Sequence, residues 1–216
     1  ESSSDRVEAP CPYYQNCGGC ELQHVAYETQ AKLKKEMLGS ALRAAGLSTS
    51  VSDALHDVVQ GEPYAYRRRI SLHLDRNGRI GFYRANSRSV VAIDSCPLTT
   101  EGINEKISHL KEIAAKLQGM ISSIVLEEDR EGVVAVFQST YALGDLEKKS
   151  IFEITKPYFD DLSLVAEGEE IGGYGRRILE YPLQEAGHLV LKVPAGSFSQ
   201  VNEKINIKLI ETVLQE

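Results

Sequence analysis

The hydrophobic positions repeat first with a helical period and then with a strand period. In residues 27–45 apolar side chains recur every three or four positions, lysines occupy the opposite side, and Gly46 follows, which predicts an amphipathic helix. In residues 66–74 polar and apolar side chains alternate, as they do in a half-buried strand. Residues 75–78, Asp-Arg-Asn-Gly, predict a tight turn, so residues 79–83 return as the partner strand.

The later part of the chain also predicts both helices and strands. A helix capped by Thr99 or Thr100 has an expected core face at Ile103, Ile107, Leu110, Ala114 and Leu117. Further strands are expected at residues 90–93, 121–126, 133–138, 162–166, 178–181 and 189–193, and further helices at 146–154 and 201–216. The predicted fold class is α+β: an antiparallel sheet with flanking helices and a four-cysteine metal-cluster loop.

Length and composition are those of a globular protein. The chain has 216 residues, 42% of them hydrophobic, which suffices for a core. No run approaches the roughly 18 apolar residues of a membrane span, and the first residues lack the apolar stretch of a signal peptide. We expect a cytoplasmic monomer with no membrane partner. Since the chain lacks an initial Met and its last predicted helix ends without a Gly cap or a Pro, we also expect an excised piece of a longer protein.

The charge distribution indicates a nucleic-acid partner despite a net charge of −7. Residues 64–93 contain a single acid, Asp75, and seven arginines: Arg67, Arg68, Arg69, Arg76, Arg79, Arg84 and Arg88. A basic stripe on an acidic body is the electrostatic footprint of a phosphate-binding surface. Tyr64, Tyr66 and Tyr83 lie among these arginines as candidate stacking platforms for bases. A solvated arginine face that binds nothing is the alternative.

The chain has four cysteines, which match the ligand count of one metal centre. Cys11, Cys17 and Cys20 lie close together with the spacing Cys-x5-Cys-Gly-Gly-Cys, and Cys96 stands far downstream in Asp-Ser-Cys-Pro. Two disulfides fit poorly with a reducing compartment. Structural zinc is the serious rival, because zinc accepts four thiolates and Cys-x2-Cys is a common zinc half-site.

A [4Fe–4S] cluster is the favoured occupant. Most zinc sites pair two half-sites, whereas this chain offers three ligands on one side and one on the other. The Gly18-Gly19 turn leaves backbone N–H groups free to point at sulfide, and cysteine followed by proline, as at Cys11 and Cys96, occurs in ferredoxin-type sites. With four protein ligands no iron is open to substrate, which favours structure or electron transfer.

Five segments in order resemble one known family. They are Cys11-Pro12-x4-Cys17-Gly18-Gly19-Cys20-x2-Gln23-His24, Tyr66-Arg67-Arg68-Arg69, Gly81-Phe82-Tyr83-Arg84, Asp94-Ser95-Cys96-Pro97-Leu98 and Ser197-Phe198-Ser199-Gln200-Val201-Asn202. The chain resembles the RNA (uracil-5-)-methyltransferases, in the iron–sulfur branch that includes the 23S rRNA 5-methyluridine enzymes. The resemblance runs from Cys11 to the end of the chain, and its four-cysteine pattern is specific.

The resemblance implies a division into three parts. Residues 1–50 would be the cysteine segment and a helix, residues 51–195 a central α+β RNA-binding domain, and residues 196–216 the start of an S-adenosylmethionine-binding methyltransferase domain. The four cysteines would be the cluster ligands. Gln200 would contact S-adenosylmethionine, and Phe198 would lie near the target base. The predicted RNA contacts are Arg67, Arg69, Arg84, Arg88 and Phe198, with rRNA favoured over tRNA.

The family mechanism requires a cysteine thiolate that adds to C6 of uracil. Each cysteine of this chain is assigned to the metal site, and no strand, Gly-rich turn and helix that would hold the cofactor follow one another. We therefore expect an inactive piece of an active methyltransferase, with no catalytic residue of its own. The competing hypothesis is a non-catalytic, zinc-stabilised nucleic-acid-binding module.

Two further features admit a structural explanation. His24 could donate a hydrogen bond beside the metal centre or be an ordinary packed histidine. Residues 172–175, Gly-Gly-Tyr-Gly, suggest a nucleotide loop, but the complete Gly-x-Gly-x-x-Gly and a following helix are missing, so a strand turn or bulge is favoured.

Overall fold

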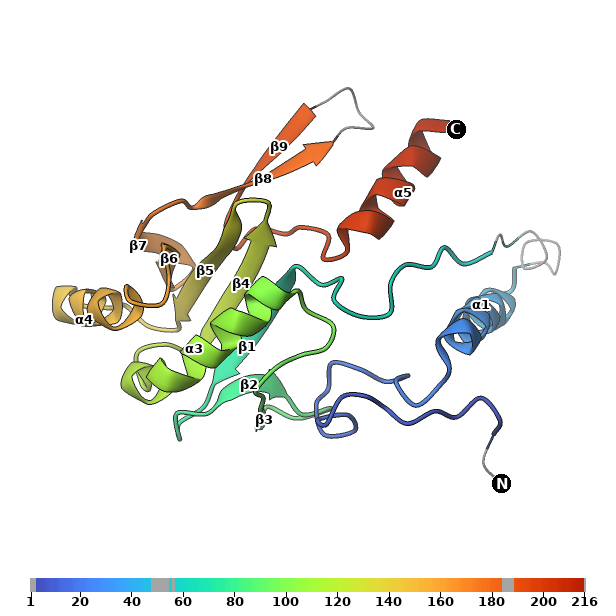
Figure 1. Cartoon of the computed structure of the whole chain (residues 1–216), viewed down its shortest axis with the longest axis horizontal. Coiled ribbons are helices and arrows are strands. Elements are labelled where there is room, and N and C mark those ends of the chain that lie inside the picture. Colours follow the sequence, from blue (N-terminus) through green and yellow to red (C-terminus); the bar gives the residue numbers. More distant parts are fainter. Residues whose placement is uncertain (1–2, 48–54, 56, 184–188, 216) are drawn as a thin grey trace.

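Helices and strands follow one another much as the periodicity predicts (Figure 1). The computed structural model describes residues 3–47, 55, 57–183 and 189–215. Its elements are α1 (Tyr27–Ala44), β1 (Arg69–Leu74), β2 (Ile80–Tyr83), β3 (Val90–Ala92), α3 (Glu101–Leu117), β4 (Ser123–Asp129), β5 (Gly132–Ser139), α4 (Asp145–Thr155), β6 (Asp161–Ala166), β7 (Glu169–Tyr174), β8 (Ile178–Leu183), β9 (Leu189–Pro194) and α5 (Glu203–Gln215). The α+β class is confirmed.

Seven strands form one sheet in the order β3-β2-β1-β4-β5-β6-β7, and β8 pairs with β9 in a second, two-stranded sheet. The expectation of a wholly antiparallel sheet is wrong at one place, because β5 and β6 run parallel. Helix α4 connects these two strands. It carries the chain back to the end of the sheet at which β5 begins, so that β6 can run in the same direction as β5. Gly172 and Gly173 lie in β7, opposite an irregularity at Leu164/Val165, so the 172–175 segment is a strand followed by a turn.

The main core lies between one face of the large sheet and helices α3 and α4. The alternation expected for β1 places Ile70 and Leu72 in this core, and Phe137 of β5 joins them. The core face predicted for the helix after Thr100 is confirmed, since its buried residues are Ile103, Ile107, Leu110, Ile113, Ala114 and Leu117. On the other face of the sheet, the β8–β9 hairpin packs Leu179 and Tyr181 against Val134.

Helix α1 lies away from the sheet, beside the N-terminal loop that carries three cysteines (Figure 1). Its limits match the prediction, and Gly46 ends it with a φ of 80°. Its apolar side chains are less buried than an amphipathic helix leads one to expect, because Met37 and Leu38 are exposed. No helix in the described part of the chain has the length and apolarity required to cross a membrane.

Candidate metal centre

The four cysteines line a single small cavity. Cys11, Cys17 and Cys20 come from the loop before α1, and Cys96 comes from the segment between β3 and α3. The cavity has a volume of about 60 Å³, and all four thiols are free. The fold thus brings the distant Cys96 to the three clustered cysteines, as their spacing predicts. No set of three or more His, Cys, Asp or Glu side chains among the residues that the structure describes is arranged to hold a metal ion.

The cysteine loop is docked onto the turn between β2 and β3. The backbone N–H of Gly18 donates to the carbonyl of Tyr83 at 2.9 Å, and Cys17 forms an isolated β-bridge with Arg84. A Cβ atom at Gly18 would lie 3.0 Å from the backbone nitrogen of Ala85 and 3.1 Å from the Tyr83 carbonyl oxygen. Gly18 is therefore required for this close approach of two backbones.

Side chains fix the loop and Cys96 to the rest of the fold. The Tyr13 hydroxyl donates to Asp94 Oδ2 and accepts from the Asp94 N–H, both at 2.8 Å. Asn104 of α3 holds the peptide of Cys96 from both sides: Oδ1 accepts from the Cys96 N–H at 2.8 Å, and Nδ2 donates to its carbonyl at 3.1 Å. The sequence gives no signal for these contacts, because each joins segments that are far apart along the chain or on different elements.

The cavity disfavours free thiolates. Burial raises the pKa of the Cys17 thiol, partly offset by the Gly19 N–H, which lies 3.4 Å from the sulfur. Burial likewise raises the pKa of Cys96, against the N–H groups of Leu98 and Thr99. Thiolates here are therefore favoured when a cation is present to stabilise them, as in a metal site.

One buried side chain and one buried atom of a partly exposed side chain lack hydrogen-bond partners at this cavity, among the described residues. They are Gln23, which is only 9% exposed, and the Nε of Arg67, a residue that is partly exposed as a whole. His24, by contrast, stacks on Tyr14 and shares a hydrogen bond with its hydroxyl. His24 is not among the residues that line the cavity, which favours the packed-histidine explanation.

A second feature is the segment 197–202, which contains Phe198 and Gln200. Ser199 is buried and donates to Glu127 Oε1 at 3.3 Å, whereas Phe198 is 82% exposed and Gln200 is exposed too. Arg68 donates from its Nε to the Gln200 carbonyl at 3.2 Å and from its backbone N–H to the Val201 carbonyl at 3.0 Å. The segment is held by its backbone and presents the two predicted functional side chains to solvent.

Comparison with known proteins indicates the family of this chain. A scan against models of protein families finds no match. Among curated proteins, the chain is 30% identical over 220 residues to the 23S rRNA (uracil(1939)-C(5))-methyltransferase RlmD of Shewanella sediminis, and 31% identical over 226 residues to that of Shewanella amazonensis. Each alignment covers 97% of this chain and 48% of the relative. The chain belongs to the RNA uracil-5-methyltransferase family.

The chain spans about half the length of the curated RNA uracil-5-methyltransferases that it matches. A solved structure has the same fold: Pyrococcus abyssi tRNA (uracil-54, C5)-methyltransferase in complex with S-adenosyl-L-homocysteine. The TM-score is 0.71 at 23% sequence identity, and the match covers 99% of this chain and 52% of that one. The family expected from the five segments is therefore confirmed.

The arginines predicted to contact RNA in this family member occupy different environments. Arg69 is paired across the strands with Glu127 at 2.9 Å and also donates to the Gly196 carbonyl at 3.0 Å. Arg67 lines the cysteine cavity. Arg84 and Arg88 are exposed near the β2–β3 turn, and Arg84 donates to Asn16 at 3.3 Å. RNA contact stays a prediction for all four residues, and Arg69 has in addition a structural role that the sequence did not indicate.

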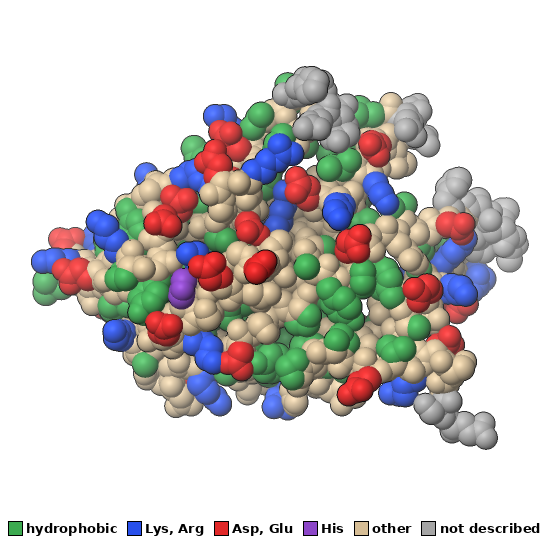
Figure 2. All heavy atoms as spheres, viewed as in Figure 1, with side chains coloured by type: hydrophobic (Ala, Val, Ile, Leu, Met, Phe, Trp, Pro, Cys, Tyr) green, Lys and Arg blue, Asp and Glu red, His purple; other side chains and the backbone are tan. Residues whose placement is uncertain are grey.

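Basic and acidic side chains are mixed on one face of the molecule. Figure 2 shows lysine and arginine side chains interspersed with acidic ones on the face that it presents. The tyrosines expected to stack on bases are also divided between two places. Tyr83 stacks on His73 with ring centroids 3.7 Å apart, whereas Tyr64 and Tyr66 line a larger cleft.

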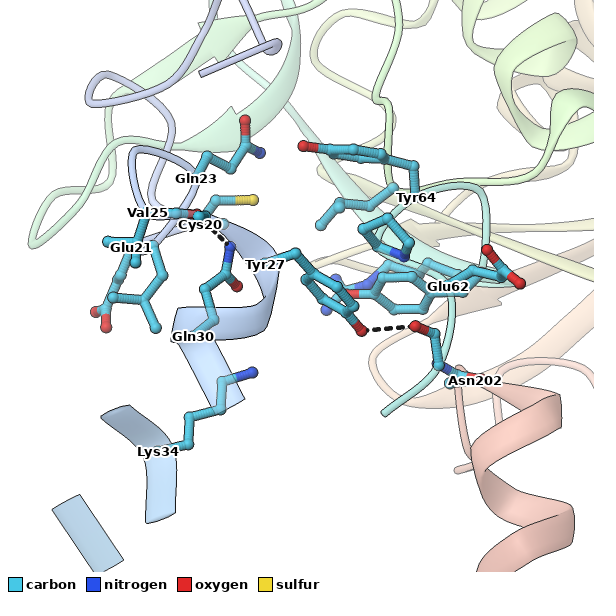
Figure 3. Close-up of a pocket in the computed structure, with 18 of the residues that line it drawn as sticks. Cys20, Glu21, Gln23, Val25, Tyr27, Gln30, Lys34, Glu62, Tyr64 and Asn202 are labelled. Carbon is cyan, nitrogen blue, oxygen red and sulfur yellow. Dashed lines mark hydrogen bonds between the residues drawn. The ribbon is translucent and has the colours of Figure 1, made fainter. Parts of the chain in front are cut away.

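That cleft, of about 750 Å³, lies between the cysteine loop with α1 and the segment leading to β1 (Figure 3). Cys20 and Gln23 lie on one wall, and Tyr64 and Glu62 lie on the other. Tyr27 crosses between the walls and donates from its hydroxyl to the Gly61 carbonyl at 2.7 Å. The cleft and the cysteine cavity share Gln23 and Arg67, so the two hollows are neighbours.

Proposed function

We propose that this chain is part of an S-adenosylmethionine-dependent RNA (uracil-5-)-methyltransferase that acts on 23S rRNA in the cytoplasm as a monomer. We further propose that it holds a [4Fe–4S] cluster at Cys11, Cys17, Cys20 and Cys96. The observation that carries the proposal is the gathering of all four thiols in one cavity. The names of the curated relatives favour rRNA over tRNA as the substrate.

The chemistry of the lining residues suits an iron–sulfur cluster. The cavity offers four soft sulfur ligands, and the peptide N–H of Gly19 together with the side-chain donors of Gln23 and Arg67 can donate to sulfur. Such a cluster, once bound, supplies a covalent tie between the loop and Cys96, and a centre that can carry one electron. No iron is left open to substrate when all four ligands are cysteines.

The remaining residues supply binding and positioning. We propose that Phe198 contacts the target base and Gln200 the methyl donor; the support is that both side chains are exposed on a segment whose backbone Arg68 holds. Arg84, which bridges to Cys17 of the cysteine loop, and Arg88 are both exposed between β2 and β3, where they can contact phosphate. The thiolate that adds to uracil must come from outside these 216 residues, since each of their cysteines lines the cavity.

Absorbance spectroscopy tests the nature of the centre. Protein purified without oxygen should be brown, with a broad band near ~400 nm. A colourless protein with one bound zinc per chain would instead support the zinc-stabilised module.

A methyl-transfer assay tests the assignment of the chemistry. The chain alone, incubated with uridine-containing rRNA and S-adenosylmethionine, should transfer no methyl group, because each of its cysteines is proposed to be a cluster ligand and not a nucleophile. Appreciable transfer by the chain alone would refute this assignment.

A further inference from the structure

Two unpartnered donors stand at the wall of the cysteine cavity. The Gln23 side-chain amide is more than nine-tenths buried, and neither of its polar atoms has a hydrogen-bond partner among the described residues. The Nε of Arg67 is also buried and unpartnered among these residues, although Arg67 as a whole is partly exposed. Both residues line the cavity that contains the four thiols.

Buried donors of this kind require a hydrogen-bond acceptor. A buried donor without a partner loses the hydrogen bond that water gives it in the unfolded chain, so native proteins rarely keep one unless a bound group satisfies it. Gln23 follows Cys20 on the loop, whereas Arg67 precedes β1. Two separate segments therefore bring an unsatisfied donor to the same small cavity, which indicates one shared acceptor inside it.

The backbone fixes Arg67 in this place. Arg67 forms isolated β-bridges with Thr99, three residues after Cys96, and with Asn202, at the end of the segment that carries Phe198 and Gln200. Its N–H also donates to the Leu98 carbonyl at 2.8 Å. The Arg67 side chain is thus positioned by the same contacts that hold the Cys96 segment.

We propose that Gln23 Nε2–H and Arg67 Nε–H donate hydrogen bonds to the sulfur atoms of the iron–sulfur cluster and raise its reduction potential. This inference rests on the proposed function. The reaction concerned is the addition of one electron from a low-potential reductant, with no proton transferred and no bond broken. The added negative charge spreads onto the sulfurs, where a donor or a nearby cation stabilises the reduced form more than the oxidised one.

The two side chains are the donors that a substitution can remove. The other N–H groups near the thiols, those of Gly19, Leu98 and Thr99, belong to the backbone and remain in any variant. Gln30 is a matched control for Gln23, because its Nε2 already donates to the Val25 carbonyl at 2.9 Å. Gln30 lines the larger cleft but not the cysteine cavity.

The test is an anaerobic redox titration followed by electron paramagnetic resonance. Wild type, Gln23→Leu, Gln23→Glu, Arg67→Met and Gln30→Leu are compared after the iron in each has been counted. At the wild-type midpoint, Gln23→Leu and Arg67→Met should each lower the ratio of reduced to oxidised cluster by about tenfold, equivalent to 59 mV for one electron. The nearly isosteric Gln23→Glu should lower it further, since it replaces a donor by a negative charge.

Each outcome has a distinct meaning. Wild-type protein without iron would remove the proposed function and this inference with it. Wild-type protein with a cluster, but Gln23 and Arg67 variants whose potentials equal that of Gln30→Leu, would overturn the inference alone. A Gln23 or Arg67 variant that folds but retains no iron, while Gln30→Leu retains it, would support the contact.

Discussion

At the residue scale, the two adjacent glycines of the cysteine loop have different reasons to be there. Gly18 approaches the backbone of Ala85 and Tyr83 so closely that a Cβ atom would lie 3.0–3.1 Å from both, and these backbone segments would have to shift. A Cβ atom at Gly19 would meet only Cys17 Sγ, at 3.5 Å, which is an ordinary contact. The sequence shows the Gly-Gly pair but does not distinguish its members, because the neighbour of Gly18 lies in a distant turn.

Gly18→Ala should therefore loosen the docking of the cysteine loop. Overpacking against a backbone costs about 1–3 kcal/mol, and we expect a loss of this size together with reduced iron retention. Gly19→Ala should change the unfolding free energy by no more than about 0.5 kcal/mol. Urea unfolding and iron retention after gel filtration measure both effects. Equal behaviour of the two variants would contradict the described docking.

Substitutions at Arg88 and Arg69 should have different effects, the first on RNA binding and the second on stability. Arg88 is exposed, so Arg88→Ala should weaken rRNA binding and reduce its salt dependence by about one counterion, with little change in unfolding free energy.

Arg69→Met leaves Glu127, which is 1% exposed, without its cation and should cost about 3 kcal/mol of stability. Filter binding at several salt concentrations and urea unfolding are the measurements. An unchanged Arg88→Ala affinity would count against the phosphate contact.

The gathering of the four cysteines is the part of the candidate site that sequence reasoning reaches best. Four cysteines with no surplus leave few combinations, and their spacing already places three of them on one loop. Asn104 and Gln23 escape such reasoning, because an isolated amide has no pattern and its role depends on the segments that the fold brings beside it. Arg69 was predicted to contact RNA because strand periodicity does not show that Glu127 lies directly opposite it.

At the scale of elements, periodicity predicts helices and strands wherever one face is buried. It succeeds for β1 and α3, whose apolar faces enter the main core. It misses β7, in which Glu169, Glu170 and two glycines give no alternation at this edge of the sheet. The parallel pairing of β5 with β6 is also not visible in the pattern, since it depends on the route of the chain through α4.

The turn between β4 and β5 is joined to β8 by a buried carboxylate. Asp129 Oδ2 accepts from the Glu180 N–H at 2.9 Å and pairs with Arg176, and Oδ1 accepts from the Glu131 N–H at 2.9 Å. Burial alone would raise the pKa of Asp129, but Arg176 and these two N–H groups outweigh it, so the pKa lies below its ordinary value.

This carboxylate predicts a pH dependence of stability. A depressed folded-state pKa contributes stability that is present above the unfolded value near ~3.9 and is lost as the pH falls through the folded value. Asp129→Asn should be less stable than wild type at pH 7, and the difference should shrink below about pH 4. Urea unfolding of both proteins between pH 7 and pH 2.5 measures this. A difference that stays constant through the acid range would contradict the role of the ionised carboxylate.

At the scale of the whole molecule, the cysteine cavity lies where parts that the chain separates widely come together. The cysteine loop leads into α1, which is little buried, and the segment of Cys96 leads into α3, which lies on the main core. Arg67 connects this region to the segment of Phe198 and Gln200 through its bridges with Thr99 and Asn202. A cluster at the four thiols would fasten the loop to the sheet at the place from which the predicted binding residues project.

The most direct measurement is the iron and acid-labile sulfide content of protein purified without oxygen, as wild type and as Cys96→Ser. Wild type should contain about four irons and about four sulfides per chain, and the loss of one ligand should lower both. Cys96 is the informative position, because it is the one proposed ligand that comes from outside the N-terminal cysteine loop. One zinc per chain with no sulfide in the wild type would contradict the account.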